Sequence, residues 1–420
     1  MQSVTRKFAT LLTASAIIAA SSPSLAGAPA DPWAGDGGVP AFYAWNQPIP
    51  ARPGIMLRTE TAPANVSLPA AGRAERILYS STDWRDPTRP TTVSGIVFFP
   101  KGEAPKGGWP VIAWAHGTTG IADVCAPSVL PRSPRDAEFL GYWLDHGYAI
   151  VATDYAGLGT PGVHPYLQYK PEGISVLDAI RAALARYPQL DAAKIVTMGQ
   201  SQGSEGAIAA AYLAPSYAPE LAIKGTVATG LIPHTENVGD APQLPIPQIY
   251  MDDQDYGNSA YEILSFLGTA RSAHPDMLAR DYLSSGGWAM LAKAQHSCMT
   301  GLRAFATQQK LTFSEFYKRK MDDLELANGP LAGMPFPDVK IKTPVFTGTG
   351  LDDRAANPAK QYNFISAMCA AGTRVQWHYY PGKTHSSAVP AALADAPAFV
   401  KAVMDGKPVA SNCAALVPPK

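Results

Sequence analysis

The sequence predicts an α/β fold: a mainly parallel central sheet with helices on both faces. Short apolar runs that suit buried strands alternate along much of the chain with helix-like stretches, and this alternation is typical of βαβ units. The chain has 420 residues, of which 46% are hydrophobic, so a sizeable core can be buried. Its formal net charge is zero. Because phosphate backbones require clustered Lys and Arg, we expect no nucleic-acid partner.

The first 26 residues have the pattern of a signal peptide. Arg6 and Lys7 supply a positive start, and the apolar run over 8–20 is too short to span a bilayer. Small residues precede Gly27, so we predict cleavage after Ala26 and an exported mature protein, extracellular or periplasmic.

The elements expected after residue 26 begin with an N-terminal arm over 27–70, which is rich in Pro, Gly and Ala and lacks clean periodicity. Short apolar runs predict strands at 76–79, 92–99, 111–115, 148–153, 194–198, 223–229, 344–347 and 374–379. Helical spacing and small residues predict core helices at 176–187, 204–213, 358–370 and 391–404. The expected α/β core therefore has two parts, 71–232 and 338–420.

The alternation stops between the two parts of the core. Residues 233–337 contain few strand candidates and several helix-like pieces, at 261–267, 287–294 and 313–324. We expect a mostly helical insertion that forms a lid or cap.

The motif that carries chemistry is Gly199-Gln200-Ser201-Gln202-Gly203, the only G-x-S-x-G match in the chain. An apolar strand precedes it and a small-residue helix follows it, as a nucleophile elbow requires. Such a turn strains the serine backbone and needs tiny neighbours, which the two glycines supply. We therefore predict Ser201 as a catalytic nucleophile.

A serine hydroxyl needs a base, and the chain order of such enzymes places a histidine after the last strand. His385 lies there, in a Gly/Pro loop after 374–379. The other histidines lie before the serine, in the insertion or inside a strand: His116, His146, His164, His234, His274, His296 and His378. His116 is expected to shape its loop.

The acid of the predicted triad should follow the strand 344–347. Asp352 and Asp353 are adjacent there. In hydrolases of this kind the acid commonly lies three residues beyond a glycine that ends the strand, which selects Asp353, with Asp352 as the alternative.

An oxyanion formed on the substrate needs two N–H donors. Gln202, directly after the serine, supplies one. The second is expected from the loop after 111–115, where Thr119 and Gly120 are candidates within 118–120. The sequence does not separate them.

The four cysteines are Cys125, Cys298, Cys369 and Cys413, and none forms a C-x-x-C pair. We therefore expect no metal site, and an even number in an exported chain favours two disulfides. Three connectivities remain open. Hydrolysis by a serine triad needs no cofactor.

Several motifs together resemble the secretory lipase family. They are His116-Gly117-Thr118-Thr119-Gly120, Cys125-Ala126-Pro127-Ser128, Ala152-Thr153-Asp154-Tyr155, Gly157-Leu158-Gly159-Thr160-Pro161-Gly162 and the serine elbow. The resemblance covers nearly all of the mature chain. It implies an α/β-hydrolase core with a helical lid, ester hydrolysis without a cofactor, and Asp353 rather than Asp352 as the acid. It also implies the disulfides Cys125–Cys298 and Cys369–Cys413.

One departure from this resemblance concerns the substrate. Many bacterial relatives carry glycine and histidine where this chain has Ser204 and Glu205. A carboxylate near the site weakens the expectation of long-chain lipids.

The sequence thus predicts a secreted serine ester hydrolase, a lipase or carboxylesterase that forms an acyl-enzyme on carboxylic esters, triacylglycerols among them. The expected partner is a small-molecule or lipid ester, with transient contact with a lipid interface and no obligate protein partner. Alternatives with the same triad are an acyltransferase, a polyester or aromatic-ester hydrolase, or a peptidase. A catalytically silent binding protein on this scaffold is the alternative of a different class.

Overall fold

Nine strands form one sheet in the computed structural model, which describes residues 37–246, 256–319 and 333–419. Their order is β1-β2-β3-β5-β4-β6-β7-β8-β9. The strands are β1 (Met56–Thr61), β2 (Arg73–Thr82), β3 (Pro90–Phe99), β4 (Trp109–Ala115), β5 (Ala149–Thr153), β6 (Leu190–Gln200), β7 (Ile223–Thr229), β8 (Val345–Gly350) and β9 (Val375–Tyr380). The signal peptide predicted over 1–26 lies outside the described residues.

The direction of the strands divides the sheet into two parts. β1, β2 and β3 pair antiparallel, and β3 joins β5 antiparallel. From β5 to β9 every pairing is parallel. The carboxyl ends of these six strands therefore meet at one edge of the sheet, where ligands bind in open α/β sheets.

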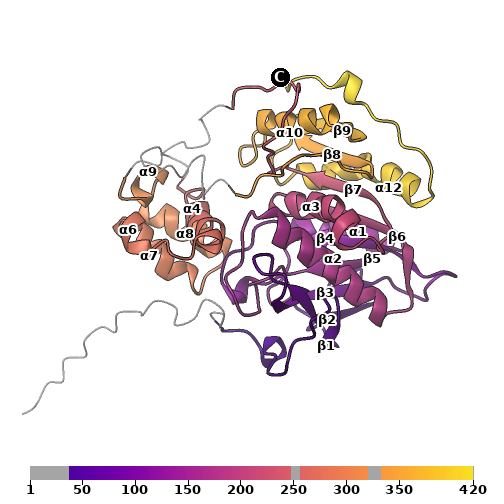
Figure 1. The fold of residues 1–420 in the computed structure, drawn as a ribbon, viewed down its shortest axis with the longest axis horizontal. Coiled ribbons are helices and arrows are strands. Elements are labelled where there is room, and N and C mark those ends of the chain that lie inside the picture. Colours follow the sequence, from indigo (N-terminus) through magenta and orange to yellow (C-terminus); the bar gives the residue numbers. More distant parts are fainter. Residues whose placement is uncertain (1–36, 247–255, 320–332, 420) are drawn as a thin grey trace, which may run out of the picture. The chain divides into compact units, whose positions relative to one another are not determined.

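Two layers of helices cover the sheet (Figure 1). In β4, Val111 and Ala113 belong to one hydrophobic cluster and Ile112 and Trp114 to another, because successive side chains point to opposite faces. The first cluster contains residues of α2 (Tyr169–Arg186), α3 (Gln202–Tyr217) and α10 (Pro358–Ala370). The second contains residues of α1 (Pro134–Asp145) and α12 (Ala396–Met404). The central strands β4, β5 and β7 are buried on both faces, which explains their continuous apolar runs.

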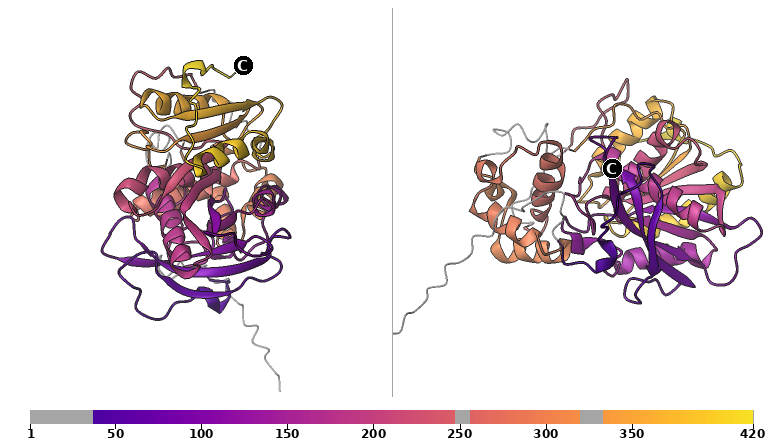
Figure 2. Two further views of the ribbon diagram at one scale, coloured as in Figure 1. Left: turned by 90° about the vertical axis from the view of Figure 1, so that its right-hand side faces the viewer. Right: turned by 60° about the horizontal axis from the view of Figure 1, so that its bottom comes forward.

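The segment between β7 and β8 is helical where the structure describes it. Its helices are α4 (Ala260–Leu264), a π-helix (Ser265–Ala270), α5 (Arg271–Ala273), α6 (Ala279–Tyr282), α7 (Ser285–Ala294), α8 (Met299–Gln309) and α9 (Phe313–Phe316). They share a hydrophobic cluster of their own, which includes Ile263, Leu302 and Phe316. The right-hand view of Figure 2 shows them gathered together. The insertion therefore has a separate small core.

Three elements differ from the sequence predictions. The expected arm contains β1, whose residues are mostly half-exposed. This edge strand carries too few apolar residues for its period to be recognised. The expected helix 391–404 is interrupted near Asp395, and only α12 continues. The helix expected at 313–324 ends at Phe316, and its last five residues lie outside the described residues.

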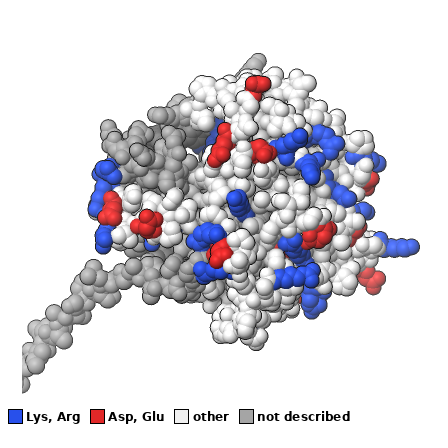
Figure 3. Space-filling model, viewed as in Figure 1, with Lys and Arg blue, Asp and Glu red and all other residues white. Residues whose placement is uncertain are grey.

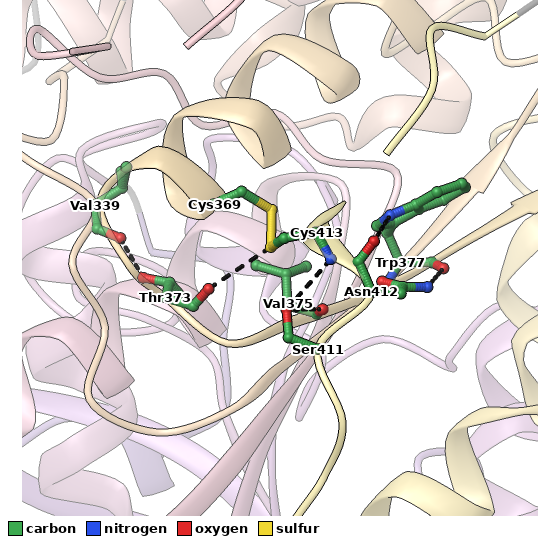
Figure 4. Close-up of a disulfide and its surroundings, with 8 residues drawn as sticks. All are labelled: Val339, Cys369, Thr373, Val375, Trp377, Ser411, Asn412 and Cys413. Atoms are coloured by element: carbon green, nitrogen blue, oxygen red, sulfur yellow. Dashed lines mark hydrogen bonds between the residues drawn. A yellow bond between two sulfur atoms is a disulfide. The ribbon is translucent and has the colours of Figure 1, made fainter. Parts of the chain in front are cut away.

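Two disulfides join distant parts of the chain, with the pairing that the family resemblance implied. Cys125 pairs with Cys298 across 173 residues, and Cys369 pairs with Cys413 across 44. Figure 4 shows the second, beside which Asn412 exchanges hydrogen bonds with the backbone of Trp377 at 2.9 Å. The C-terminal segment is therefore fastened along β9.

The surface carries mixed charge. In the view of Figure 3, acidic and basic side chains are interspersed rather than gathered by sign, in keeping with the zero net charge of the sequence. Among the described residues, no helix has the length and apolar character needed to cross a membrane.

Candidate active site

The serine elbow lies at the carboxyl end of β6, in the middle of the sheet. Ser201 has φ 58° and ψ −126°, an uncommon backbone conformation for a residue with a side chain. Its N–H donates to the carbonyl of Thr229 at 3.1 Å, which ties the elbow to the end of β7. Ser201 therefore stands between strand and helix in the strained turn that the sequence predicted.

The glycines of the elbow are required by close packing. A β-carbon at Gly199 would overlap the carbonyl of Gly203, and one at Gly203 would overlap the carbonyl of Ala115. The first turn of α3 thus lies directly against the end of β4. Only glycine permits this approach.

His385 and Asp353 form a pair at the same edge of the sheet. Nδ1 of His385 lies 2.8 Å from Oδ2 of Asp353. Asp353 is 3% exposed, whereas Asp352 is exposed to solvent. The neighbouring N–H groups of Ala355 and Ala356 donate to Oδ1 of Asp353 at 2.9 and 2.7 Å. A carboxylate held in this way favours the imidazole tautomer with its proton on Nδ1, which leaves Nε2 free to accept a proton.

The end of β7 brings the histidine close to the elbow. A β-carbon at Gly230 would stand 2.7 Å from Cε1 of His385, so the ring lies against Gly230. Gly230 follows Thr229, whose carbonyl accepts the N–H of Ser201. Ser201 and His385 are therefore both positioned by the end of β7.

The loop that follows β4 also reaches the elbow. A β-carbon at Gly117 would lie 3.6 Å from Cβ of Ser201. Further along, Gly120 packs against Cys125 and Cys298, and the carbonyl of Thr119 accepts the N–H of Met299 at 2.8 Å. The Cys125–Cys298 disulfide thus fastens the loop that contains the two oxyanion candidates to the helical insertion.

The backbone N–H and the side-chain amide of Gln202 point to different surroundings. It is the first residue of α3, and N–H groups in the first helical turn have no acceptor within the helix. Its side-chain amide lies 2.9 Å from Oε1 of Glu172 and 2.8 Å from Nε2 of His164. Burial lowers the pKa of His164 to about 3, so this ring is neutral and accepts from Gln202. The side chain is therefore anchored away from the backbone N–H.

His116 lies between the loop after β4 and the end of β5. It is buried, and its ring nitrogens lie 2.8 Å from the carbonyl of Gly117 and 3.2 Å from that of Asp154. Burial lowers its pKa to about 4. Because a neutral imidazole carries one N–H, it donates to only one of these carbonyls, and the ring lies between the loop after β4 and the end of β5.

One residue that sequence reasoning missed is Gln361, in α10. Its Nε2 donates to Oδ2 of Asp353 at 3.0 Å and to the carbonyl of Ala356 at 2.6 Å. Its Oε1 accepts from Leu231 N–H at 3.1 Å and from Oγ1 of Thr349 at 3.0 Å. This fully buried amide joins Asp353 to the ends of β7 and β8. No local motif distinguishes it from the other glutamines.

Within the described residues, no cluster of three or more His, Cys, Asp or Glu side chains is arranged to hold a metal ion.

Comparison with known proteins gives the following matches. The family model described as secretory lipase matches residues 135–412. Lipase A of Moesziomyces aphidis is 25% identical over 296 residues, which are 66% of this chain and 59% of that protein. A secreted triacylglycerol lipase of Malassezia globosa is 24% identical over 396 residues, 86% of this chain and 78% of that protein. The chain thus spans less than two thirds of the first of these relatives.

Solved structures with the same fold include Candida antarctica lipase A, with a TM-score of 0.66 at 19% identity over 87% of this chain and 85% of that one. A rice cell wall degrading esterase from Xanthomonas oryzae has a TM-score of 0.59 at 15% identity, over 84% of this chain and 98% of that one. Together with the mainly parallel sheet between helices, these likenesses confirm the predicted α/β-hydrolase fold.

Proposed function

Because this chain belongs to the secretory lipase family, we propose that it is an exported serine hydrolase of carboxylic esters, with Ser201, His385 and Asp353 as its triad. The observation that carries the proposal is the hydrogen-bonded pair of His385 and the buried Asp353 beside a strained serine elbow. Nucleophilic catalysis requires a nucleophile, a base that activates it and a group that orients the base. Ser201, His385 and Asp353, which follow three different strands, suit these three roles.

In the first step, Oγ of Ser201 attacks the ester carbonyl while Nε2 of His385 takes the hydroxyl proton. The carbon–oxygen bond to the alcohol then breaks, and His385 returns the proton to the leaving alkoxide. Asp353 keeps the ring in the required tautomer and stabilises the imidazolium. The product of this step is an acyl-enzyme on Ser201 and a free alcohol.

In the second step, His385 takes a proton from water, which attacks the acyl carbon. Collapse of the intermediate releases the acid and restores the serine hydroxyl. In both steps the oxyanion is held by the N–H of Gln202 and by one donor from the loop 118–120, at Thr119 or Gly120. Each donor of this kind lowers the activation barrier by roughly 3–4 kcal/mol.

The substrates are carboxylic esters, triacylglycerols among them. The name of the Malassezia relative supports the triacylglycerol part. We assign the segment 233–337 as the lid over the site and the place of transient contact with a lipid interface. The family description and the two disulfides suggest secretion, and we assign cleavage after Ala26.

The test is a panel of p-nitrophenyl esters from acetate to palmitate, measured on the wild type and on Ser201→Ala. The wild type should hydrolyse several members and be labelled by a fluorophosphonate. Ser201→Ala should lose turnover and labelling while keeping the wild-type circular dichroism spectrum. Ser216→Ala, at an exposed position of the same helix, is the control and should keep both. Labelling that persists in Ser201→Ala would refute the assignment, and added alcohol that captures most acyl groups would indicate a transferase.

A further inference from the structure

The segment 164–172 leads from the loop after β5 into the first turn of α2 and contacts the residue beside the nucleophile. Oε1 of Glu172 lies 2.9 Å from Nε2 of Gln202, and Nε2 of His164 lies 2.8 Å from the same nitrogen. All three side chains are almost completely buried. The proposed mechanism uses only the backbone N–H of Gln202, so it assigns no role to these contacts.

The donors and acceptors of this cluster are complementary. Nδ1 of His164 lies 3.0 Å from the carbonyl of Ala156, so Nδ1 carries the proton of the neutral ring and Nε2 accepts. The two protons of the Gln202 amide therefore have one acceptor each. Burial and the neighbouring Glu205 raise the pKa of Glu172, which favours the neutral acid with Oε1 as its carbonyl oxygen. The amide of Gln202 is thus held in one orientation.

The same segment contacts the loop that is expected to supply the second oxyanion donor. The hydroxyl of Tyr166, a residue that is 5% exposed, lies 3.1 Å from Oγ1 of Thr118. Thr118 directly precedes the donor candidates Thr119 and Gly120. The segment 164–172 therefore contacts both of the backbone stretches that would hold the oxyanion.

The segment is itself held in a fixed conformation. Leu167 has φ 52°, a left-handed conformation that is uncommon for a residue with a side chain, and its N–H donates to Oε1 of Glu172 at 3.1 Å. The carbonyl of Tyr166 accepts from Oγ1 of Thr269 at 2.7 Å, and Nε2 of Gln168 donates to the carbonyl of Thr269 at 3.1 Å. Thr269 belongs to the π-helix of the insertion. A strained residue persists only where its surroundings fix it, so the segment can serve as a rigid support.

We propose that Glu172, His164 and Tyr166 are positioning residues that hold the two sides of the oxyanion hole at the spacing the tetrahedral intermediate requires. An oxyanion is stabilised most by donors that are already oriented before the charge develops. The anchored side chain of Gln202 limits rotation of the backbone that carries its N–H, and the Tyr166 hydroxyl limits movement of the loop after β4. This inference rests on the proposed ester hydrolysis and adds the residues that support its transition state.

The test measures the affinity for an inhibitor that needs the oxyanion hole, a hexyl trifluoromethyl ketone. Oγ of Ser201 adds to the ketone carbon, the hydroxyl proton passes to His385, and the carbonyl oxygen becomes an oxyanion. Glu172→Leu and Tyr166→Phe should each raise the inhibition constant by about tenfold to a hundredfold, because small misplacements of catalytic groups have effects of this size. They should lower kcat for p-nitrophenyl butanoate in the same proportion and change KM by about twofold at most.

The inhibition constant separates positioning from stability. Partial unfolding lowers the concentration of active enzyme but leaves the inhibition constant of the folded molecules unchanged. Glu172→Gln keeps the Oε1 acceptor and should keep an inhibition constant close to that of the wild type. Tyr187→Phe is the control, since it removes a buried hydroxyl that donates to Glu75 at 2.6 Å, just beyond the far end of α2. This variant should lose stability and keep the wild-type inhibition constant.

Two results would overturn different conclusions. Wild-type inhibition constants in both Glu172→Leu and Tyr166→Phe would overturn the positioning role, and a wild-type value in one of them would remove that residue from it. If Glu172→Leu does not fold, His164→Phe takes its place, because it removes the other acceptor of the Gln202 amide. A wild type that hydrolyses no ester would instead overturn the proposed function.

Discussion

The imidazole of His385 lies against Gly230, where a β-carbon would stand 2.7 Å from Cε1 and 2.9 Å from Nδ1 of the ring. Gly230→Ala should therefore push the ring away from Asp353 and lower kcat by about tenfold to a hundredfold, since small misplacements of catalytic groups have effects of this size. Esterase kinetics on p-nitrophenyl butanoate measure the loss.

Gly239→Ala is the matched control for this substitution. Gly230 and Gly239 have φ of 58° and 55°, so alanine is strained at either position, by roughly 1–2 kcal/mol. A β-carbon at Gly239 meets no atom within 4 Å. Both variants should lose the stability that the backbone strain costs, and only Gly230→Ala should lose kcat. Equal activity in the two variants would count against His385 as the base.

The adjacent carboxylates Asp352 and Asp353 offer a second matched pair. Asp353→Asn keeps the shape of the side chain but no longer holds the histidine in the required tautomer. We expect kcat to fall by roughly a thousandfold to ten-thousandfold. Asp352→Asn, at the exposed neighbour, should change kcat less than twofold. The reverse ranking would make Asp352 the acid.

Gln361 should act as a positioning residue for Asp353. Gln361→Leu removes the donor to Oδ2 of Asp353 and should lower kcat about tenfold or more, with little change in KM, because no contact with substrate is lost. It should also lower the melting temperature, since the N–H of Leu231 loses its acceptor.

The split between kcat and KM distinguishes this role from a structural one. Gln309→Leu, at the exposed end of α8, is the control. If Gln361→Leu lowers the melting temperature but keeps the wild-type kcat well below that temperature, the amide serves the fold alone.

The two disulfides should differ in their effect on activity. Replacing either pair by alanines should cost about 2–5 kcal/mol of unfolding free energy. Of the four cysteines, Cys125 and Cys298 pack on Gly120, in the loop with the oxyanion candidates. The double variant at these two positions should therefore also lower kcat at temperatures where it is still fully folded, whereas the other double variant should not. Denaturant unfolding and esterase assays on the two double variants test this, and equal kcat values would contradict it.

How far the sequence predicts the site can be seen from the triad residues. The elbow was predictable because the overlap at Gly199 and Gly203 admits only glycine, which leaves a local pattern. His385 was predictable from its place after the last strand. The choice between Asp352 and Asp353 rested on spacing and resemblance, and burial of Asp353 is a property of the folded chain.

The sequence by itself determined the alternation of buried strands and helices, the elbow and the order of serine, aspartate and histidine, because each depends on residues that are close in the chain. Only the tertiary structure decided which cysteines pair, that Gln361 donates to Asp353, that the weakly apolar segment before β2 forms an edge strand, and that Glu205 is buried. These depend on contacts between segments far apart in the sequence, where packing and desolvation act on residues that carry no local pattern.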